Sequence, residues 1–283
     1  MYSVSSLAWE PSGAKLVVGT LTGAVDVYVT SMKRAIYAPT SKDGRARAQF
    51  EILYTSKRQI QITKLVSGTR VPSTKLSSIR GHEITKVDIY RDQFVVAFTT
   101  ETLLLGNLST LKLSEIPWTQ SGTERFHFDN ERIVMAYQHS ELTVVEYENN
   151  TPLITLRTEH ISPYLVSCVV NDARTSAHAG VPASQKLAYL IDLQTVKVLD
   201  IVSGASHQVS HDFAIDWIEL NQKGSHLLFR DRRRHLHLFN ALSGERVLLL
   251  NYVGYVQWVP YSDVIVVRSL TPQRNRTLLV FHA

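Results

Sequence analysis

The sequence predicts an all-β fold, a β-propeller of seven blades. Three observations support this prediction. Short segments rich in Val, Ile, Leu, Tyr and Phe alternate with turn residues, the pattern returns with a period near forty, and no helical periodicity lasts beyond two turns. Four-stranded propeller blades repeat every ~40–45 residues. We therefore expect residues 1–283 to form a single domain of this kind.

The first repeat can be read strand by strand. Residues 4–9, 15–20 and 24–29 each predict a strand, and residues 34–38 predict a fourth. Similar groups of strands return along the chain. One apolar residue in the first strand of each group marks the period: Leu7, Ile52, Val87, Phe126, Val166, Ile215 and Val256. Their mean spacing of about 41.5 residues predicts seven blades.

The last repeat predicts a blade that lacks its outer strand. Only the segments 253–258, 263–268 and 277–282 have strand character there. An open sheet edge is normally covered in a native protein. Either the chain is a piece of a longer one or a partner supplies a strand, and we favour the first explanation.

Composition indicates a globular chain with a mild excess of positive charge. Hydrophobic residues make up 44% of the sequence, charged residues 19%, and the formal net charge is +5. No apolar window reaches the ~18 residues of a membrane span, and the N-terminus lacks the pattern of a signal peptide. Cys168, the one cysteine, lies among valines, so we expect a buried thiol and a reducing, cytoplasmic environment.

Motifs of common enzymes are absent from the sequence. Neither a phosphate-binding loop nor a Gly-x-Ser-x-Gly elbow occurs, so we expect no catalysis, no cofactor and no small-molecule substrate. His235 and His237, two apart on a predicted strand, and His207 and His211, flanking another, allow a metal hypothesis. Further ligands cannot be placed, however. We therefore favour polar residues on a solvated strand and expect no metal.

Two groups of basic residues are the candidates for contact with a partner. They are Arg230, Arg232, Arg233 and Arg234 in one predicted turn, and Lys42, Arg45, Arg47, Lys57 and Arg58 in and after a loop. A solvated face is one interpretation. The other is contact with an anionic surface, such as membrane lipid, an acidic tail or a phosphorylated partner. Nucleic acid is disfavoured, because the charge is small and no aromatic–basic strip accompanies it.

Other residues are expected to be structural. The tryptophans Trp9, Trp118, Trp217 and Trp258 are predicted to pack between blades rather than to stack on bases. Gly81 and His82 form the Gly-His pair that opens many WD repeats, in which the histidine has a packing role.

A series of segments, in order along nearly the whole chain, resembles the second WD-repeat propeller of the intraflagellar transport protein 172 family. These segments are 7–16, 19–23, 67–71, 100–108, 113–118, 141–147, 186–192, 227–232 and 257–264. The chain departs from ordinary WD repeats, since none of its predicted third strands ends in Trp-Asp.

The resemblance implies the largest subunit of the intraflagellar transport B complex, with two propellers followed by a helical-repeat solenoid. It implies a scaffold without catalytic residues, which binds other intraflagellar transport subunits and supports assembly of the cilium or flagellum. The implied location is the basal body and axoneme. The alternative function is that of a membrane- or coat-associated propeller whose basic turns bind anionic lipid.

Overall fold

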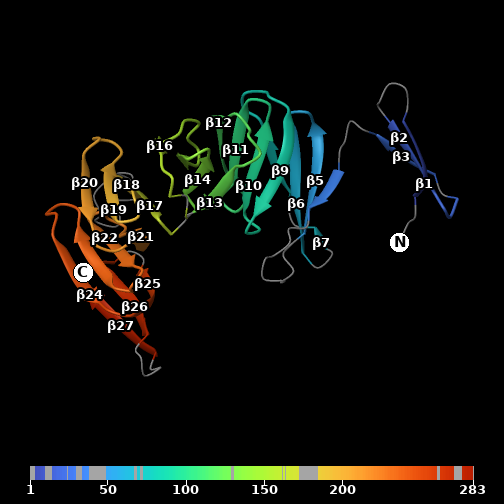
Figure 1. Ribbon diagram of the computed structural model, residues 1–283. Helices are drawn as coiled ribbons and strands as arrows, with labels where there is room; N and C mark the ends of the chain where they lie inside the picture. The colour runs from blue at the N-terminus through green and yellow to red at the C-terminus, as the bar shows by residue number, and fades with distance from the viewer. Residues whose placement is uncertain are drawn as a thin grey trace. The chain divides into compact units, whose positions relative to one another are not determined.

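The computed structural model describes an all-β chain (Figure 1). The described residues are 4–9, 15–23, 25–29, 34–37, 49–66, 69–70, 73–128, 131–160, 162, 164–171, 184–259, 262–270 and 276–282. They contain no helix, and hence none of the length and apolar character needed to cross a membrane.

The described residues form seven antiparallel sheets, which follow one another along the chain. The first has three strands, β1 (Val4–Trp9), β2 (Lys15–Thr20) and β3 (Val25–Val29). The second consists of β4 (Arg34–Tyr37), β5 (Gln49–Ser56), β6 (Gln59–Val66), β7 (Thr69–Arg70) and β8 (Thr74–Ser77). The third consists of β9 (Ile84–Tyr90), β10 (Phe94–Thr99), β11 (Thr102–Asn107) and β12 (Lys112–Pro117).

The next three sheets are four-stranded meanders, like the third. The fourth contains β13 (Arg125–Phe128), β14 (Ile133–Gln138), β15 (Glu141–Glu146) and β16 (Ile154–Arg157). The fifth contains β17 (Val166–Asn171), β18 (Ser184–Leu190), β19 (Thr195–Asp200) and β20 (Ser206–Ser210). The sixth contains β21 (Ile215–Leu220), β22 (His226–Asp231), β23 (Leu236–Asn240) and β24 (Arg246–Leu250).

The seventh sheet has three described strands, β25 (Val253–Trp258), β26 (Val264–Leu270) and β27 (Arg276–His282). The predicted all-β class is confirmed, and the seven blade-like sheets agree with the expected number of blades. The absence of an outer strand from the last sheet stays a prediction. Each of the seven apolar residues that marked the period lies in a different sheet.

One predicted pairing was wrong. Residues 34–38 were expected to complete the first sheet, but β4 pairs with β5 in the second, with Arg34 opposite Leu53 and Tyr37 opposite Phe50. Alternation of apolar residues identifies a strand, but it does not say which of two neighbouring strands it joins.

By its contacts the chain divides into two compact units. One comprises Met1–Gly122 and Glu146–Thr151, the other Thr123–Val145 and Pro152–Ala283. The single domain expected from the sequence therefore stays a prediction.

Within each unit, neighbouring sheets pack face to face through apolar cores. Strands β10 and β11 are buried along their whole length, which explains their nearly continuous apolar sequences. In the second unit, one core contains Ala188 and Phe229 and lies between the fifth and sixth sheets. Another core contains Trp258 and lies between the sixth and seventh sheets. The fourth strands β20 and β24 are mostly exposed. The first three strands of these sheets therefore supply the cores, and turns and outer strands remain for contacts.

The turn after β21 requires a glycine. Gly224 has a φ of +68°, and a Cβ there would lie 2.9 Å from Ser184 Oγ and 3.1 Å from the Lys186 side chain. Gly224→Ala is expected to lower the free energy of unfolding by about 2 kcal/mol, from both backbone strain and crowding. Gly244 has a φ of +75° with nothing within 4 Å of such a Cβ, so Gly244→Ala serves as the control for strain alone. Equal losses in urea unfolding would show that the crowding has no effect.

Candidate functional site

The turn between β22 and β23 carries most of the second unit's candidate residues. The Asp231 backbone N–H donates to the His235 carbonyl at 3.1 Å, and the His235 N–H donates to Asp231 Oδ1 at 2.9 Å. Arg234 adopts a φ of +69°, and its N–H donates to the Asp231 carbonyl. These bonds fix the turn's backbone, so the side chains it projects start from a defined position.

Three arginines of this turn are exposed. The Arg233 guanidinium lies 3.5 Å from the ring centroid of Phe213, a cation–π contact. Arg234 lies 4.0 Å from Asp216, at the limit of an ion pair. Together with Arg232, they present three positive charges at one place on the surface.

Arg230 has a different environment from the other three. Its Nε donates to Asp216 Oδ1 at 2.7 Å and its Nη1 donates to the Gly254 carbonyl at 3.3 Å, while only 14% of its side chain is exposed. It ties β22 to β21 and β25. The sequence grouped Arg230 with the turn arginines, but the structure places it inside the packing.

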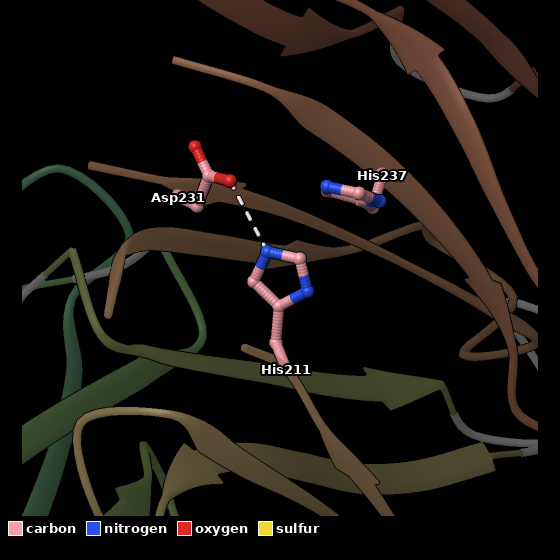
Figure 2. A group of neighbouring side chains, drawn as sticks. All are labelled: His211, Asp231 and His237. Carbon is pink, nitrogen blue, oxygen red and sulfur yellow. Dashed lines mark hydrogen bonds and ion pairs between the residues drawn. The ribbon is translucent and has the colours of Figure 1, made fainter. Parts of the chain in front are cut away.

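Beneath the turn lies a buried polar cluster (Figure 2). His211, which follows β20, has its Nε2 3.1 Å from Asp231 Oδ2. His235 Nδ1 lies 3.2 Å from the same oxygen. His237 extends from β23 beside His211, with ring centroids 4.6 Å apart, and its ring stacks on Phe229. Three imidazoles thus surround one carboxylate that is completely buried.

Burial and neighbouring groups set the charges in this cluster. Burial is the largest influence on His237 and, with nearby His211, lowers its pKa to about 4. Burial acts to raise the pKa of Asp231, but hydrogen bonds from His235 and His211 outweigh it and hold that pKa below its ordinary value. At neutral pH, Asp231 is therefore a carboxylate and His237 a neutral imidazole.

The sequence paired these histidines differently. It placed His235 and His237 on one face of a strand, but β23 begins at Leu236 and His235 belongs to the turn before it. His207 lies exposed on β20, away from the group formed by His211, Asp231 and His237. Asp231 was missed as a partner of these histidines. Its place four residues before His235 was the available signal, whereas the approach of His211 depends on the packing of two sheets.

The second basic group is only partly described. Lys42, Arg45 and Arg47 lie outside the described residues. Lys57 and Arg58 occupy the exposed turn between β5 and β6, where Lys57 Nζ lies 3.8 Å from Glu83. These two residues belong to the first unit and the arginine turn to the second, so contact of both groups with one surface stays a prediction.

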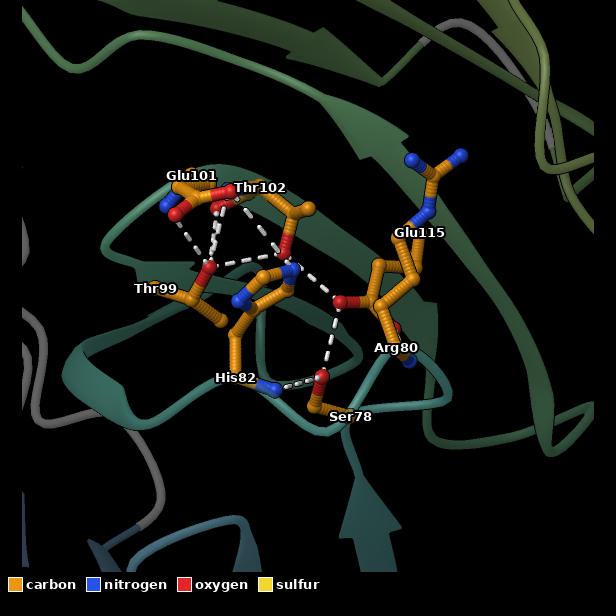
Figure 3. A network of polar contacts seen from close by, with 7 residues as sticks. All are labelled: Ser78, Arg80, His82, Thr99, Glu101, Thr102 and Glu115. Atoms are coloured by element: carbon orange, nitrogen blue, oxygen red, sulfur yellow. Dashed lines mark hydrogen bonds and ion pairs between the residues drawn. The ribbon is translucent and has the colours of Figure 1, made fainter.

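Gly81 and His82 lie in the loop from β8 to β9, beside a buried carboxylate (Figure 3). Gly81 has a φ of +79°. The His82 N–H donates to Ser78 Oγ at 3.0 Å, and its Nε2 lies 4.0 Å from Glu101. Ser78 in turn donates to Glu115 at 2.8 Å. Their surroundings are those of a loop anchored to a sheet.

Glu115 of β12 collects four donors. Thr102 Oγ1 donates at 2.6 Å and Ser78 Oγ at 2.8 Å to its Oε1, while the backbone N–H groups of Ile79 and Arg80 donate to its Oε2. Burial acts to raise the pKa of Glu115, but these hydrogen bonds together lower it. No local sequence pattern identifies Glu115, because its donors from the loop are 35 to 37 residues away.

The tryptophans have dissimilar environments. Trp258 is 7% exposed and its Nε1 donates to the Glu219 carbonyl, which joins the seventh sheet to the sixth. Trp217 packs against the same core. Trp9, in contrast, is 62% exposed on β1, an environment unlike that of the packing residue expected from the sequence.

Comparison with known proteins connects the chain to one family. Intraflagellar transport protein 172 of Chlamydomonas reinhardtii is 50% identical over 95% of the chain, and the human homolog is 41% identical over the same share. The resemblance to the intraflagellar transport protein 172 family is confirmed. The chain matches it as a partial segment, spanning 14% and 15% of the length of these two relatives.

Comparisons with family models and with solved structures give no further support for a family. No family model matches the chain. Among solved structures, Kluyveromyces lactis Hsv2 covers the whole chain at 12% identity with a TM-score of 0.43, which is too low to support an argument. The similarity to intraflagellar transport protein 172 therefore rests on sequence, and the fold on the seven sheets themselves.

Proposed function

We propose that this chain is a protein-binding segment of intraflagellar transport, a scaffold in the B complex that supports ciliary or flagellar assembly and transport. The sequence similarity to intraflagellar transport protein 172 along 95% of the chain supports this role. Its partners would be other intraflagellar transport subunits, and its location the cilium or flagellum, at the basal body and axoneme. Catalysis forms no part of the proposal.

The arginine turn is the surface we propose for partner contact. Arg232, Arg233 and Arg234 are exposed on a backbone fixed by the hydrogen bonds around Asp231. A fixed cationic turn suits an acidic surface of a protein partner, because its backbone loses little conformational entropy on binding. The membrane alternative has only the charge of the turn in its favour and stays a prediction.

The test is capture of intraflagellar transport subunits from ciliary extract by the purified chain. Neutralising the turn with Arg232→Gln, Arg233→Gln and Arg234→Gln is expected to weaken capture about tenfold, which corresponds to about 0.5 kcal/mol per exposed charge. The contact should also weaken with salt, since the charges are exposed.

A matched control removes the same charge elsewhere. Lys75, Arg125 and Arg157 are exposed and lie outside both basic groups, so their triple replacement by glutamine should leave capture unchanged. Equal loss in the two triple variants would mean that overall charge, and not the turn, determines capture. Absence of these subunits from the wild-type capture would count against the scaffold function itself.

A further inference from the structure

The buried cluster under the arginine turn has the composition of a transition-metal site. One ligand atom from each of His211, Asp231 and His237 lies within 4.8 Å of the others. His235 adds a fourth candidate, with Nδ1 3.2 Å from Asp231 Oδ2. The four residues come from four places in the chain: the segment after β20, the last residue of β22, the β22–β23 turn and strand β23.

An unsatisfied nitrogen points to a missing ligand. His237 is 8% exposed, and its Nε2 has no hydrogen-bond partner among the described residues. A buried polar atom without a partner costs about 1–3 kcal/mol, and such atoms in native proteins call for an explanation. The ring itself is held in place by stacking on Phe229, 4.9 Å between centroids with an interplanar angle of 9°. A bound metal ion would supply the partner that this nitrogen lacks.

Two of the donor spacings match tetrahedral coordination, and the others require the side chains to move closer. Ligand atoms at 2.0–2.1 Å from a tetrahedral Zn²⁺ are separated by about 3.3 Å. His211 Nε2 and His235 Nδ1 lie 3.1 Å and 3.2 Å from Asp231 Oδ2. The ligand atom of His237 lies up to 4.8 Å from those of His211 and Asp231 and would have to move closer by up to about 1.5 Å. His235 lies outside the group whose ligand atoms are all within 4.8 Å of one another, so its ring would have to turn towards His211 and His237.

The donor set indicates the class of metal. Imidazole nitrogens with one carboxylate suit Zn²⁺ and its neighbours in the first transition row, whereas Ca²⁺ and Mg²⁺ require mostly oxygen ligands. We propose that His211, Asp231, His235 and His237 form a binding site for Zn²⁺ or a similar transition-metal ion. This proposal differs from the expectation drawn from the sequence, which was that the chain binds no metal. The proposed metal site does not depend on partner contact by the turn arginines.

Arg246 is the neighbour that opposes metal binding. Its Nη1 lies 3.4 Å from His211 Nδ1 and donates to the Ser210 carbonyl at 3.0 Å. When a metal occupies Nε2, Nδ1 carries the proton, so two donors would face each other. Arg246 is exposed and can withdraw towards Ser210. Glutamine at this position could instead accept from Nδ1–H, so Arg246→Gln should tighten metal binding about tenfold.

The main test titrates the purified, chelator-treated chain with Zn²⁺ against a chromophoric chelator, and measures zinc retained after gel filtration. The wild-type chain should bind one equivalent. His237→Phe keeps a ring to stack on Phe229 but removes the nitrogens, so it should weaken binding at least 100-fold. His207→Phe alters an exposed histidine outside the cluster and should bind as the wild-type chain does.

Two results of the zinc titration would contradict the proposed metal site. No retained zinc in the wild-type chain, or equal affinity in His237→Phe and wild type, would overturn the site. Should His237→Phe fail to fold, His235→Gln tests a half-buried ligand at the surface of the cluster, with at least tenfold weaker binding expected and unchanged affinity counting against the proposal.

Discussion

Replacing Glu115 by alanine is expected to lower the free energy of unfolding by about 4 kcal/mol, measured by urea denaturation at pH 7. The substitution removes the acceptor of two hydroxyl groups and two backbone N–H groups, which anchor the loop at Ser78–Arg80 to strand β12. Glu115 is completely buried, so water cannot replace the carboxylate without rearrangement. Each orphaned buried donor costs about 1–3 kcal/mol, and partial relaxation of the loop keeps the total below the sum.

Glu101 provides the matched control for Glu115. It is a glutamate of the same network, but its side chain is 73% exposed and lies 4.0 Å from His82. Glu101→Ala should therefore cost less than about 0.5 kcal/mol, the usual range for an exposed ion pair. Comparable losses for the two alanine variants would contradict the anchoring role of Glu115.

The contribution of Glu115 should also depend on pH. Its pKa in the folded chain lies below the ordinary value of 4.5, so the folded state favours the carboxylate. The stabilisation is present above that ordinary value and is lost as the pH falls through the lower folded pKa. The gap in unfolding free energy between the wild-type chain and Glu115→Gln should accordingly narrow between pH 5 and pH 2, and a constant gap would exclude this ionisation as its source.

The sheets could be predicted from the sequence because their signals are local. Alternating apolar residues between turns identified strands such as β1 and β2, and a period near forty grouped them. The partner of β4 could not be predicted in this way. Pairing depends on which edge is free when the strand arrives, and the alternation in residues 34–37 fits either neighbour.

In the candidate site, too, local features could be predicted from the sequence and contacts between distant residues could not. Crowding of arginines in one turn is a local feature, and the structure does place Arg232, Arg233 and Arg234 together on the surface. The burial of Arg230 against Asp216 could not be predicted, because Asp216 lies on the neighbouring strand, 14 residues earlier. Likewise, His211 meets Asp231 only because the fifth and sixth sheets pack against each other.

Phe229→Ala should cause the other large loss, about 4 kcal/mol of unfolding free energy. The side chain is 0% exposed in the core between the fifth and sixth sheets. Its ring also supports the polar cluster, stacked on His237 and edge-on to His211 at 5.4 Å. Alanine would leave a cavity beside two imidazoles, and the loss of apolar contacts adds to the loss of the ring contacts.

Two further variants separate the causes of that loss. Phe229→Leu fills most of the volume but has no aromatic face, and it should cost about 1.5 kcal/mol, since a near volume-conserving change is tolerated in a core. Leu242→Ala, at a position 73% exposed, should change the unfolding free energy by less than about 0.5 kcal/mol. If Phe229→Leu is as unstable as Phe229→Ala, the lost unfolding free energy comes from the ring contacts with His211 and His237. If Phe229→Ala, Phe229→Leu and Leu242→Ala all lose little unfolding free energy, the fifth and sixth sheets do not pack around Phe229. The loss of unfolding free energy should be largest for Phe229→Ala, smaller for Phe229→Leu and smallest for Leu242→Ala, because it depends first on the buried volume removed and only secondarily on the chemistry of the ring.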